Sequence, residues 1–416
     1  MMHLVIVEDN VEGLYPFSVL HCTWELRCGP ERCIDAWTRM LRPSSLEFCG
    51  REAHIASFLA RFPRTLPSAS NSSILVVRTS LLPTRSMCDS LLQAVKAAGE
   101  HPVSEQATFT RFVVDSTTVA LLYPHDVPIH AEDILDEAAL ATSHWVTCEL
   151  DGVRINNLYS SLDHVADSIA DYDFSSLSAA AEYSQQTSGV FLLHPERVFI
   201  GSNIRIDPCV VLDATDGPII IESGVHVQAH SVLMGPCFIG QGSKIKAGAK
   251  IYPHSVIGEL CKVGGEVENS IIHAFSNKQH EGFLGHSYIG EWVNLGADTN
   301  TSDLKNTYGA IRITRRSKPV DTGRMFLGLL CGDHTKSGIN TMFTTGTVCG
   351  IHANVFGAGY APQEISSFAW GAIGDNRRYP LKKAIAVAET VLQRRGRILL
   401  PEEVALMEAE FNLHAS

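Results

Sequence analysis

The residue types that could do chemistry concentrate in one segment of the chain's second half. Lys278 and His280 lie two positions apart, Glu266 and Glu268 precede them, and Asn294 follows. A histidine oriented by a carboxylate can remove a proton from a substrate near neutral pH. A lysine can bind a phosphate as a point charge. The segment is therefore a candidate for proton transfer, although a histidine in such a turn can also be a solvated surface residue.

These residues interrupt a strict six-residue period. The aliphatic series is Ile221, Val227, Leu233, Ile239, Ile245, Ile251, Ile257 and Val263. Neither a 3.6-residue helix nor a two-residue strand produces this spacing, and a short fixed period is typical of stacked repeats. We expect a parallel β-helix whose coils place the aliphatic residue inward and a small residue at each corner. The regular coils should be the scaffold, with chemistry where the period breaks.

The remaining organisation is predicted from local patterns. Residues 1–150 alternate short apolar strands with amphipathic helices, which predicts an α/β domain with a parallel or mixed sheet. Residues 151–193 are expected to be a helical linker, residues 194–380 the β-helix, and residues 381–416 two C-terminal helices. A helix start at Pro401 fits this division, because proline is followed there by two acidic residues.

Bulk properties exclude several classes. A net charge of −12 argues against nucleic acid as the main partner. No run of 18 apolar residues and no signal pattern occurs, so we expect a cytoplasmic protein without membrane contact. The eleven cysteines form no Cys-x-x-Cys pair and should be free thiols, with Cys209, Cys237 and Cys261 as small core residues of the coils. Cys22, Cys28 and Cys33 lack the spacing of a structural zinc site.

Two neighbouring segments carry a family resemblance. Residues 277–285 read Asn-Lys-Gln-His-Glu-Gly-Phe-Leu-Gly, and residues 287–302 contain Tyr-Ile-Gly-Glu-Trp-Val-Asn-Leu-Gly-Ala-Asp-Thr. They resemble the acetyltransferase centre of the bifunctional enzymes that make UDP-N-acetylglucosamine. Residues 300–306 and 332–343, and the N-terminal Tyr-Pro-Phe and Leu-Arg-Cys-Gly stretches, are still more similar to a variant branch of that family described as sugar nucleotidyltransferases.

The resemblance implies a left-handed β-helix that assembles as a homotrimer and transfers an acetyl group from acetyl-CoA to an amino sugar phosphate. His280 matches the base of the family, and Glu268 is its expected carboxylate partner, with Glu266 as the alternative. Asn294 matches the asparagine that binds the amine region of the sugar. Lys278 would then bind the sugar phosphate.

Further positions depart from the family pattern. Phe283 stands where the family has tyrosine, and Asp303 falls near a family asparagine, which implies an altered sugar or binding mode. His334 and Lys336 are candidate binding residues, unless Asp333 and His334 simply form hydrogen bonds in a coil corner. The basic loop at 305–318 is either a solvated excursion or a contact to phosphates at a neighbouring subunit.

For the first domain, the resemblance implies nucleotidyl transfer from a nucleoside triphosphate to a sugar-1-phosphate, with Mg²⁺ held by a carboxylate. The family's glycine-rich loop is replaced here by Glu-Asp-Asn-Val-Glu-Gly at residues 8–13, and its Thr-Arg-Pro by Val19-Leu20-His21. Arg27 and Arg78 are the remaining candidates for phosphate binding, although either could be a surface ion pair. This activity is expected to be altered or lost.

Three hypotheses follow for the whole chain. The first is a sugar-phosphate enzyme with nucleotidyl transfer, acetyl transfer or both. The second keeps nucleotidyl transfer alone, as in hexose-1-phosphate thymidylyltransferases, with the β-helix as a trimerisation scaffold. The third is a scaffold without catalysis.

Overall fold

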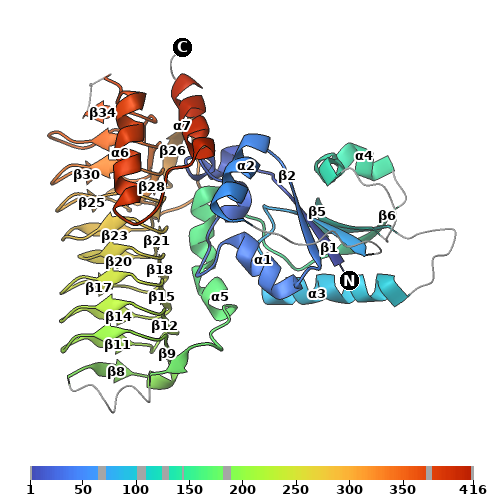
Figure 1. The fold of residues 1–416 in the computed structure, drawn as a ribbon, viewed down its shortest axis with the longest axis horizontal. Coiled ribbons are helices and arrows are strands. Elements are labelled where there is room, and N and C mark those ends of the chain that lie inside the picture. Colours follow the sequence, from blue (N-terminus) through green and yellow to red (C-terminus); the bar gives the residue numbers. More distant parts are fainter. Residues whose placement is uncertain are drawn as a thin grey trace.

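The protein consists of an α/β domain, a column of stacked coils, and two helices that lie where these parts meet. The computed structural model describes residues 2–63, 72–100, 109–123, 131–142, 145–180, 189–371 and 377–413. In Figure 1 the α/β domain stands beside the column, and both C-terminal helices run along the column's last coils. No helix in the described ranges is long and apolar enough to cross a membrane.

The first domain is built on a six-stranded mixed sheet. Its strands are β1 Met2–Val7, β2 Ser45–Cys49, β3 Ser73–Arg78, β4 Phe109–Val114, β5 Thr117–Tyr123 and β6 Trp145–Glu149. Their order in the sheet is β2-β1-β3-β5-β4-β6. β1 is parallel to β2 and β3, whereas β5 is antiparallel to both β3 and β4. The predicted α/β domain with a mixed sheet is confirmed.

Helices and short turns cover both faces of this sheet. The α-helices are α1 Cys33–Leu41, α2 Glu52–Arg61, α3 Arg85–Glu100, α4 Glu137–Thr142 and α5 Val165–Ala170. The 3-10 turns of this domain are η1 Glu12–Leu14, η2 Phe17–Val19, η3 Thr23–Glu25, η4 Ala131–Leu135 and η5 Leu158–His164, whereas η6 Pro195–Arg197 lies in the first coil, between residues 193 and 198. Leu4 and Ile6 of β1 join the large core that contains Trp24 and Trp37. Their neighbour Val5 points to the opposite face, which η4 and α4 cover.

From residue 189 onward the chain winds into coils with three flat faces. Face I, toward the α/β domain, contains β9 Val198–Ile200, β12 Ile219–Ile221, β15 Cys237–Ile239, β18 Ser255–Ile257, β21 Ile271–Ile272, β24 Tyr288–Ile289, β28 Leu329–Cys331, β31 Thr347–Cys349 and β33 Glu364–Ile365, with β7 Ser178–Ala179 at its edge. Face II contains β10 Arg205–Ile206, β13 His226–Val227, β16 Lys244–Ile245, β19 Lys262–Val263, β22 Asn277–Lys278, β29 Lys336–Ser337, β32 Asn354–Val355 and β34 Trp370–Gly371. Face III contains β8 Phe191–Leu193, β11 Val211–Asp213, β14 Val232–Met234, β17 Lys250–Ile251, β20 Glu266–Glu268, β23 Phe283–Gly285, β25 Asn300–Thr301 and β30 Met342–Phe343.

The pairings along each face confirm the predicted parallel β-helix. Successive coils pair in parallel register, as in Ile221 with Ile239 and Ile245 with Val263. All eight aliphatic residues of the six-residue series are fully buried, so the period marks the inward position. The left-handed turn of the coils remains a prediction from the resemblance.

The corners explain which small residues the coils require. Gly240 follows an inward aliphatic residue at a corner, and its backbone has no positive φ. A Cβ there would lie 2.6 Å from the carbonyl carbon of Gly258 in the next coil, so close stacking demands glycine. Gly248, in contrast, adopts φ +75°. Cys237 and Cys261 are buried as predicted, but Cys209, at a corner with φ 65°, is exposed, so this part of the prediction is wrong.

Face I also supplies the contact surface between the domains. In β12, Ile219 and Ile221 belong to the core inside the coils, whereas Ile220 joins the core of the α/β domain. The outward Tyr288 of β24 contacts Phe17, with ring centroids 5.8 Å apart. This face is apolar on both sides because it separates two cores.

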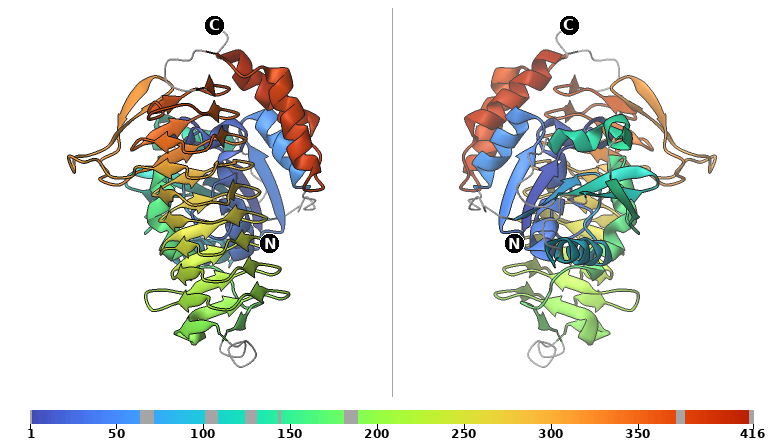
Figure 2. Two further views of the ribbon diagram at one scale, coloured as in Figure 1. Left: turned by 90° about the vertical axis from the view of Figure 1, so that its left-hand side faces the viewer. Right: turned by 90° about the vertical axis from the view of Figure 1, so that its right-hand side faces the viewer.

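The last two helices close the structure. α6 Leu381–Gln393 and α7 Pro401–Leu413 confirm the predicted pair, and Figure 2 shows them side by side along the upper coils. α7 also packs against α2 of the first domain. The buried Glu410 accepts a hydrogen bond from Ser367 at 2.7 Å and pairs with Arg316 at 3.0 Å. α7 therefore holds coils and domain together.

The basic loop forms a hairpin of β26 Arg312–Arg315 and β27 Lys318–Asp321. Arg315 donates a hydrogen bond to the carbonyl of Gly13 at 2.9 Å, and Arg316 pairs with Glu410. Lys305 donates a hydrogen bond to the carbonyl of Ala310. Through Arg315 and Arg316 the loop therefore contacts its own chain. The two alternatives predicted from the sequence, a solvated excursion and a contact to phosphates at a neighbouring subunit, did not include this.

Candidate functional site

The motif segment lies at the corner between faces II and III, here called the II–III corner. Lys278 ends β22 on face II, and Phe283 begins β23 on face III. His280 lies in the turn between these strands, and it is exposed. Within the described residues its imidazole makes no side-chain hydrogen bond. The corner therefore presents an imidazole to solvent.

The proposed carboxylate partners do not reach this histidine within the protomer. In the described part of the chain, no hydrogen bond or ion pair joins His280 to Glu268 or Glu266. Glu268 pairs in register with Gly285, and Glu266 lies 3.3 Å from the ammonium of Lys250. The pairing of His280 with a carboxylate therefore stays a prediction.

Lys278 points into the corner, away from solvent. Its side chain is buried, and its ammonium donates hydrogen bonds to the carbonyls of Gly264 at 2.8 Å and His280 at 3.1 Å. Burial lowers the pKa of Lys278 to about 8. In this protomer Lys278 braces the turn that carries His280.

The other motif residues lie on neighbouring coils. Asn294 is exposed on face II, between Asn277 and Lys336 in register. Phe283 is half-buried, and its backbone N–H donates to Oδ1 of Asn300 at 2.8 Å. The structure thus groups Asn294 and Lys336 beside the His280 turn.

Asp303 is engaged elsewhere, at the corner between faces III and I. Its carboxylate lies 2.8 Å from Nδ1 of His286, whose ring stacks on Phe326. Asp303 therefore does not join the His280 turn within the protomer.

At its other edge face I meets face II, here called the I–II corner. Carboxylates at this corner face the α/β domain. Glu259, Glu291 and Asp333 each follow a glycine at the same place of three coils. Arg27 donates two hydrogen bonds of 2.6 Å to Glu259, and His21 lies 2.7 Å from Asp333. The I–II corner thus binds the first domain by a buried pair at Asp333 and a partly buried pair at Glu259.

His21 is the centre of this network. Its second ring nitrogen lies 3.3 Å from Glu25, whose carboxylate also pairs with Arg61 at 2.9 Å. Burial would lower the pKa of His21, but Asp333 and Glu25 outweigh it and raise the pKa to about 10. His21 is therefore a cation at neutral pH.

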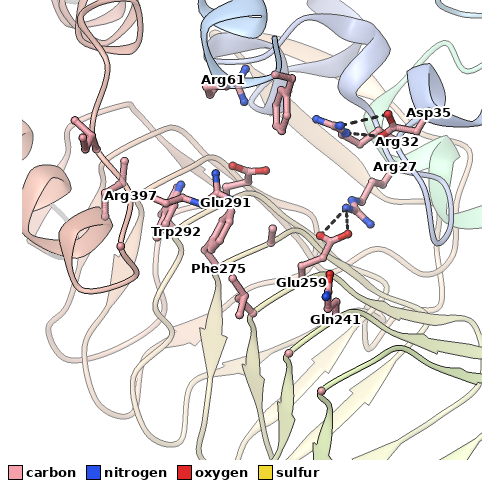
Figure 3. A pocket seen from close by; sticks show the side chains of 18 of the residues that line it. Arg27, Arg32, Asp35, Arg61, Gln241, Glu259, Phe275, Glu291, Trp292 and Arg397 are labelled. Carbon is pink, nitrogen blue, oxygen red and sulfur yellow. Dashed lines mark hydrogen bonds and ion pairs between the residues drawn. The ribbon is translucent and has the colours of Figure 1, made fainter. Parts of the chain in front are cut away.

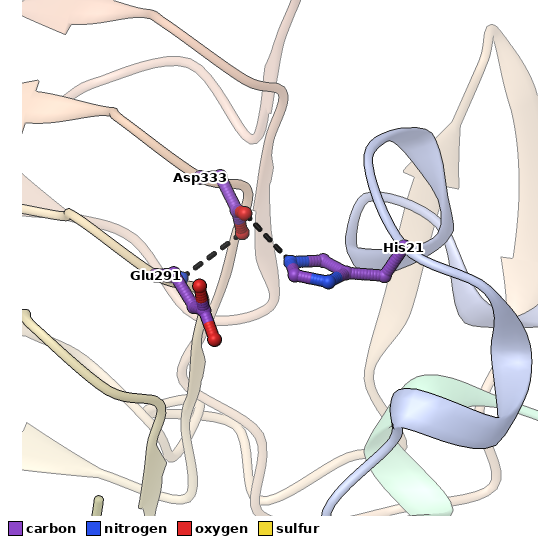
Figure 4. Close-up of side chains that lie close together, drawn as sticks. All are labelled: His21, Glu291 and Asp333. Carbon is purple, nitrogen blue, oxygen red and sulfur yellow. Dashed lines mark hydrogen bonds and ion pairs between the residues drawn. The ribbon is translucent and has the colours of Figure 1, made fainter. Parts of the chain in front are cut away.

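His21, Glu291 and Asp333 are also the set of side chains, among the described residues, that could hold a metal ion (Figure 4). Their ligand atoms lie within 4.8 Å of one another. However, His21 and Asp333 are at direct hydrogen-bond distance, and the other oxygen of Asp333 accepts the N–H of Glu291 at 3.0 Å. We assign this cluster as an ion-pair network between the domains.

A column of stacked rings follows the same corner. It contains Phe275, Trp292, His334, His352 and Phe368, all with φ between 53° and 65°. Centroid distances are 4.2 Å for the first pair and 4.5 Å between the two histidines. Burial lowers the pKa of His334, which favours its neutral form in the column. The ammonium of Lys336 donates to the carbonyl of His334 at 2.9 Å.

A cavity of about 1040 Å³ opens beside this column (Figure 3). Its walls come from the first domain, the I–II corner and the loop between α6 and α7. Arg27 is the residue of the sequence prediction that lines it. Sequence reasoning missed Arg61, Glu291, Trp292 and Arg397. Aligning the coils by their corner glycines would have placed Glu259, Glu291 and Asp333 in one column and indicated a shared partner.

Arg78 lies apart from Arg27. It is the last residue of β3, is buried, and donates hydrogen bonds to the carbonyl of Ile134 and to Glu137 on the η4 and α4 side of the sheet. Because Arg27 binds the β-helix, the structure does not bring these two arginines together.

The resemblance implies Mg²⁺ held by a carboxylate of the first domain, without naming the residue, and the two carboxylates that directly follow β1 do not fit this role. Glu8 binds Arg51, and Asp9 accepts hydrogen bonds from Thr79 and Ser80. Both carboxylates are thus engaged within the protein, so we derive no reaction step through Mg²⁺.

Together the fold and its corners define a class: an α/β domain joined to a parallel β-helix of hexapeptide coils. No family model matches the chain. It is 29% identical over 142 residues to a bifunctional sugar-1-phosphate nucleotidylyltransferase/acetyltransferase of Sulfurisphaera tokodaii, covering 34% of this chain and 35% of that protein. It is 38% identical over 107 residues to the bifunctional protein GlmU of Methylococcus capsulatus, covering 25% of this chain and 22% of that protein.

The resemblance inferred from the motifs is therefore confirmed in sequence, over about a third of the chain or less. The chain spans about a third of the length of the first relative and under a quarter of the second. Among solved structures, an Arabidopsis UDP-N-acetylglucosamine acyltransferase matches with a TM-score of 0.29 and 13% identity, covering 50% of this chain and 76% of that one.

Proposed function

We propose that this chain is a transferase of nucleotide-sugar synthesis whose β-helix transfers an acetyl group to an amino sugar phosphate. The observation that carries the proposal is the exposed His280, whose imidazole has no hydrogen-bond partner in the described chain, at the motif-bearing II–III corner. The names of the relatives support the same reaction. Acetyl-CoA as donor and the cytoplasmic location belong to this proposal.

In the proposed reaction a ring nitrogen of His280 takes a proton from the sugar amine as the amine attacks the thioester carbonyl. The new C–N bond forms, the C–S bond breaks, and the CoA thiolate leaves and takes up a proton. Asn294, exposed on the neighbouring coil, would bind the amine region of the sugar. Lys278 would position His280, because its ammonium donates a hydrogen bond to the backbone carbonyl of His280.

The site needs a second copy of the chain. No carboxylate of the described chain orients His280, although a general base of this kind works best with such a partner. We therefore propose a homotrimer in which a neighbouring subunit completes the II–III corner, since closed symmetric assemblies are the rule for homo-oligomers. Sedimentation velocity should give three chains per particle.

The test measures thiol release from acetyl-CoA in the presence of glucosamine-1-phosphate. His280→Ala should reduce kcat about 100-fold or more, which is typical for loss of a general base. His230→Ala is the matched control, because His230 is exposed at the same corner of an earlier coil. Absence of thiol release from the wild-type protein, or equal effects of both variants, would refute acetyl transfer.

Nucleotidyl transfer by the α/β domain is the second candidate. Its support is the name of the Sulfurisphaera relative together with the mixed sheet, while Arg27 and Arg78 are both engaged in ion pairs. The test measures pyrophosphate release from UTP or dTTP with a hexose-1-phosphate and Mg²⁺. Pyrophosphate release without thiol release would favour a nucleotidyltransferase on a trimer scaffold. No release of either product would favour a scaffold without catalysis.

A further inference from the structure

The cavity between the domains is separate from the II–III corner and has no role in the proposed acetyl transfer. It lies beside the I–II corner, and three parts of the chain distant in sequence form its walls (Figure 3). Its volume of about 1040 Å³ is at the upper end for small-molecule sites in proteins. A cavity of this size suits a ligand of several rings or phosphates.

Some of the charged side chains around this cavity are already paired. Arg27 uses one Nη on the carbonyl of Pro30 and the other on both oxygens of Glu259. Arg32 pairs with Asp35 at 2.7 Å. These pairs fix the walls, because their hydrogen bonds are charge-assisted and partly buried.

Other groups retain free binding capacity. One terminal nitrogen of the Arg61 guanidinium donates a hydrogen bond to Glu25, and the other terminal nitrogen makes no hydrogen bond within the described residues. Arg397 is exposed and lies 4.6 Å over the ring of Phe275, with no carboxylate partner in the described chain. Two arginines are therefore available to an anion.

Two acceptor groups face the same space. The carboxylate of Glu291 is 15% exposed, and Nδ1 of the buried His273 is 3.9 Å away, beyond hydrogen-bond distance. Burial would raise the pKa of Glu291, but His273, His21 and Arg61 lower it to about 2, so it stays ionised. Gln241 is exposed and also lines the cavity. Carboxylate and amide oxygens suit hydroxyl donors.

We propose that this cavity binds a phosphorylated sugar, with phosphate on Arg61 and Arg397 and a sugar hydroxyl on Glu291. The shared chemistry is a sugar ring carrying phosphate, which both a hexose phosphate and the ribose phosphate of a nucleotide provide. Because Arg397 belongs to the loop between α6 and α7, the ligand would also contact all three parts of the chain.

Binding is measured by isothermal titration calorimetry on the full chain with glucose-1-phosphate, UMP, inorganic phosphate and glucose as separate probes. Arg397→Gln and Glu291→Gln should each weaken binding about tenfold, since each removes a hydrogen bond to a charged group. Arg394→Gln is the matched control, because Arg394 is exposed on the adjoining helix end and does not line the cavity. Arg397 is on the surface, so its variant should fold normally.

Stronger binding of glucose-1-phosphate than of UMP would identify a hexose phosphate as the source, and the reverse would identify a nucleotide. Inorganic phosphate binding as tightly as either would overturn the sugar assignment. No binding by any probe, or binding that neither variant weakens, would overturn the site. His280→Ala should leave the affinity unchanged, so failure of this proposal is distinguishable from failure of acetyl transfer.

Discussion

The two outer edges of face II perform opposite tasks with the same coil geometry. At the I–II corner, Glu259 and Asp333 are tied to Arg27 and His21 of another domain. At the II–III corner, His280 is exposed and has no hydrogen-bond partner in the described chain. A repeating scaffold gives each corner equivalent backbone positions, so the residue types alone decide which edge docks a domain and which stays open.

The strongest test of this difference is removal of Asp333. Asp333→Ala leaves Glu25 as the one carboxylate hydrogen-bonded to the buried His21 cation, and loss of one partner of a buried pair costs about 3–5 kcal/mol. Urea denaturation should show this loss of unfolding free energy. His280→Ala, at the open corner, should leave the midpoint unchanged, and equal losses would remove the distinction between the corners.

The second test is the pH dependence of the docked corner. The folded pKa of His21 is raised to about 10, above its ordinary value of 6.5, so protonated His21 stabilises the fold fully below about pH 6.5. This contribution is lost as the pH rises through about 10. The difference in unfolding free energy between wild type and His21→Gln should therefore shrink from pH 6.5 to pH 10. A difference that stays constant over this range would contradict the assignment of His21 as a cation.

Glycines at the two corners provide the next comparison. A Cβ at Gly240 would meet the backbone of the next coil at 2.6 Å, so Gly240→Ala should cost about 3 kcal/mol by overpacking. Gly248 has nothing within 4 Å of such a Cβ but adopts φ +75°, so Gly248→Ala should cost about 1–2 kcal/mol. Thermal melts of both variants measure the ranking. A larger decrease of the melting temperature for Gly248→Ala would show that backbone strain at a positive φ costs more than a steric clash between stacked coils.

The smallest effect is expected at an ion pair beside the open corner. Lys250 and Glu266 lie 3.3 Å apart, and both side chains are about 40% exposed. Exposed pairs contribute about 0–1 kcal/mol, so Glu266→Gln should leave the melting temperature nearly unchanged. A marked decrease of the melting temperature would mean that face III is held by charge as the I–II corner is.

The coils could be predicted because their signal is local and repeated. Every aliphatic residue of the series from Ile221 to Val263 is buried, and the small corner residues Ser243 and Ala249 have no exposure. The mixed sheet and both C-terminal helices also followed from short-range patterns. The sequence pattern that predicts each of these features lies within a short stretch of the chain.

The cavity could not be predicted, because its residues meet only through the docking of distant segments. Arg61 ends α2, Glu291 follows β24, and Arg397 lies after α6. No periodicity relates these positions. The sequence placed His280 in a motif, but the expected contact with Glu268 or Glu266 is not formed within the described chain, because these side chains point to other parts of face III.

The long sequence separation between His21 and Asp333 affects folding during translation. They are 312 residues apart, and ribosomes add about 5–20 residues per second, so His21 waits about 15–60 s for its partner. During that interval the apolar side of the first domain, with Phe17 and Trp24, lacks the coils that later cover it. The nascent domain is then a client for chaperones, and slower translation should lengthen its exposure to aggregation.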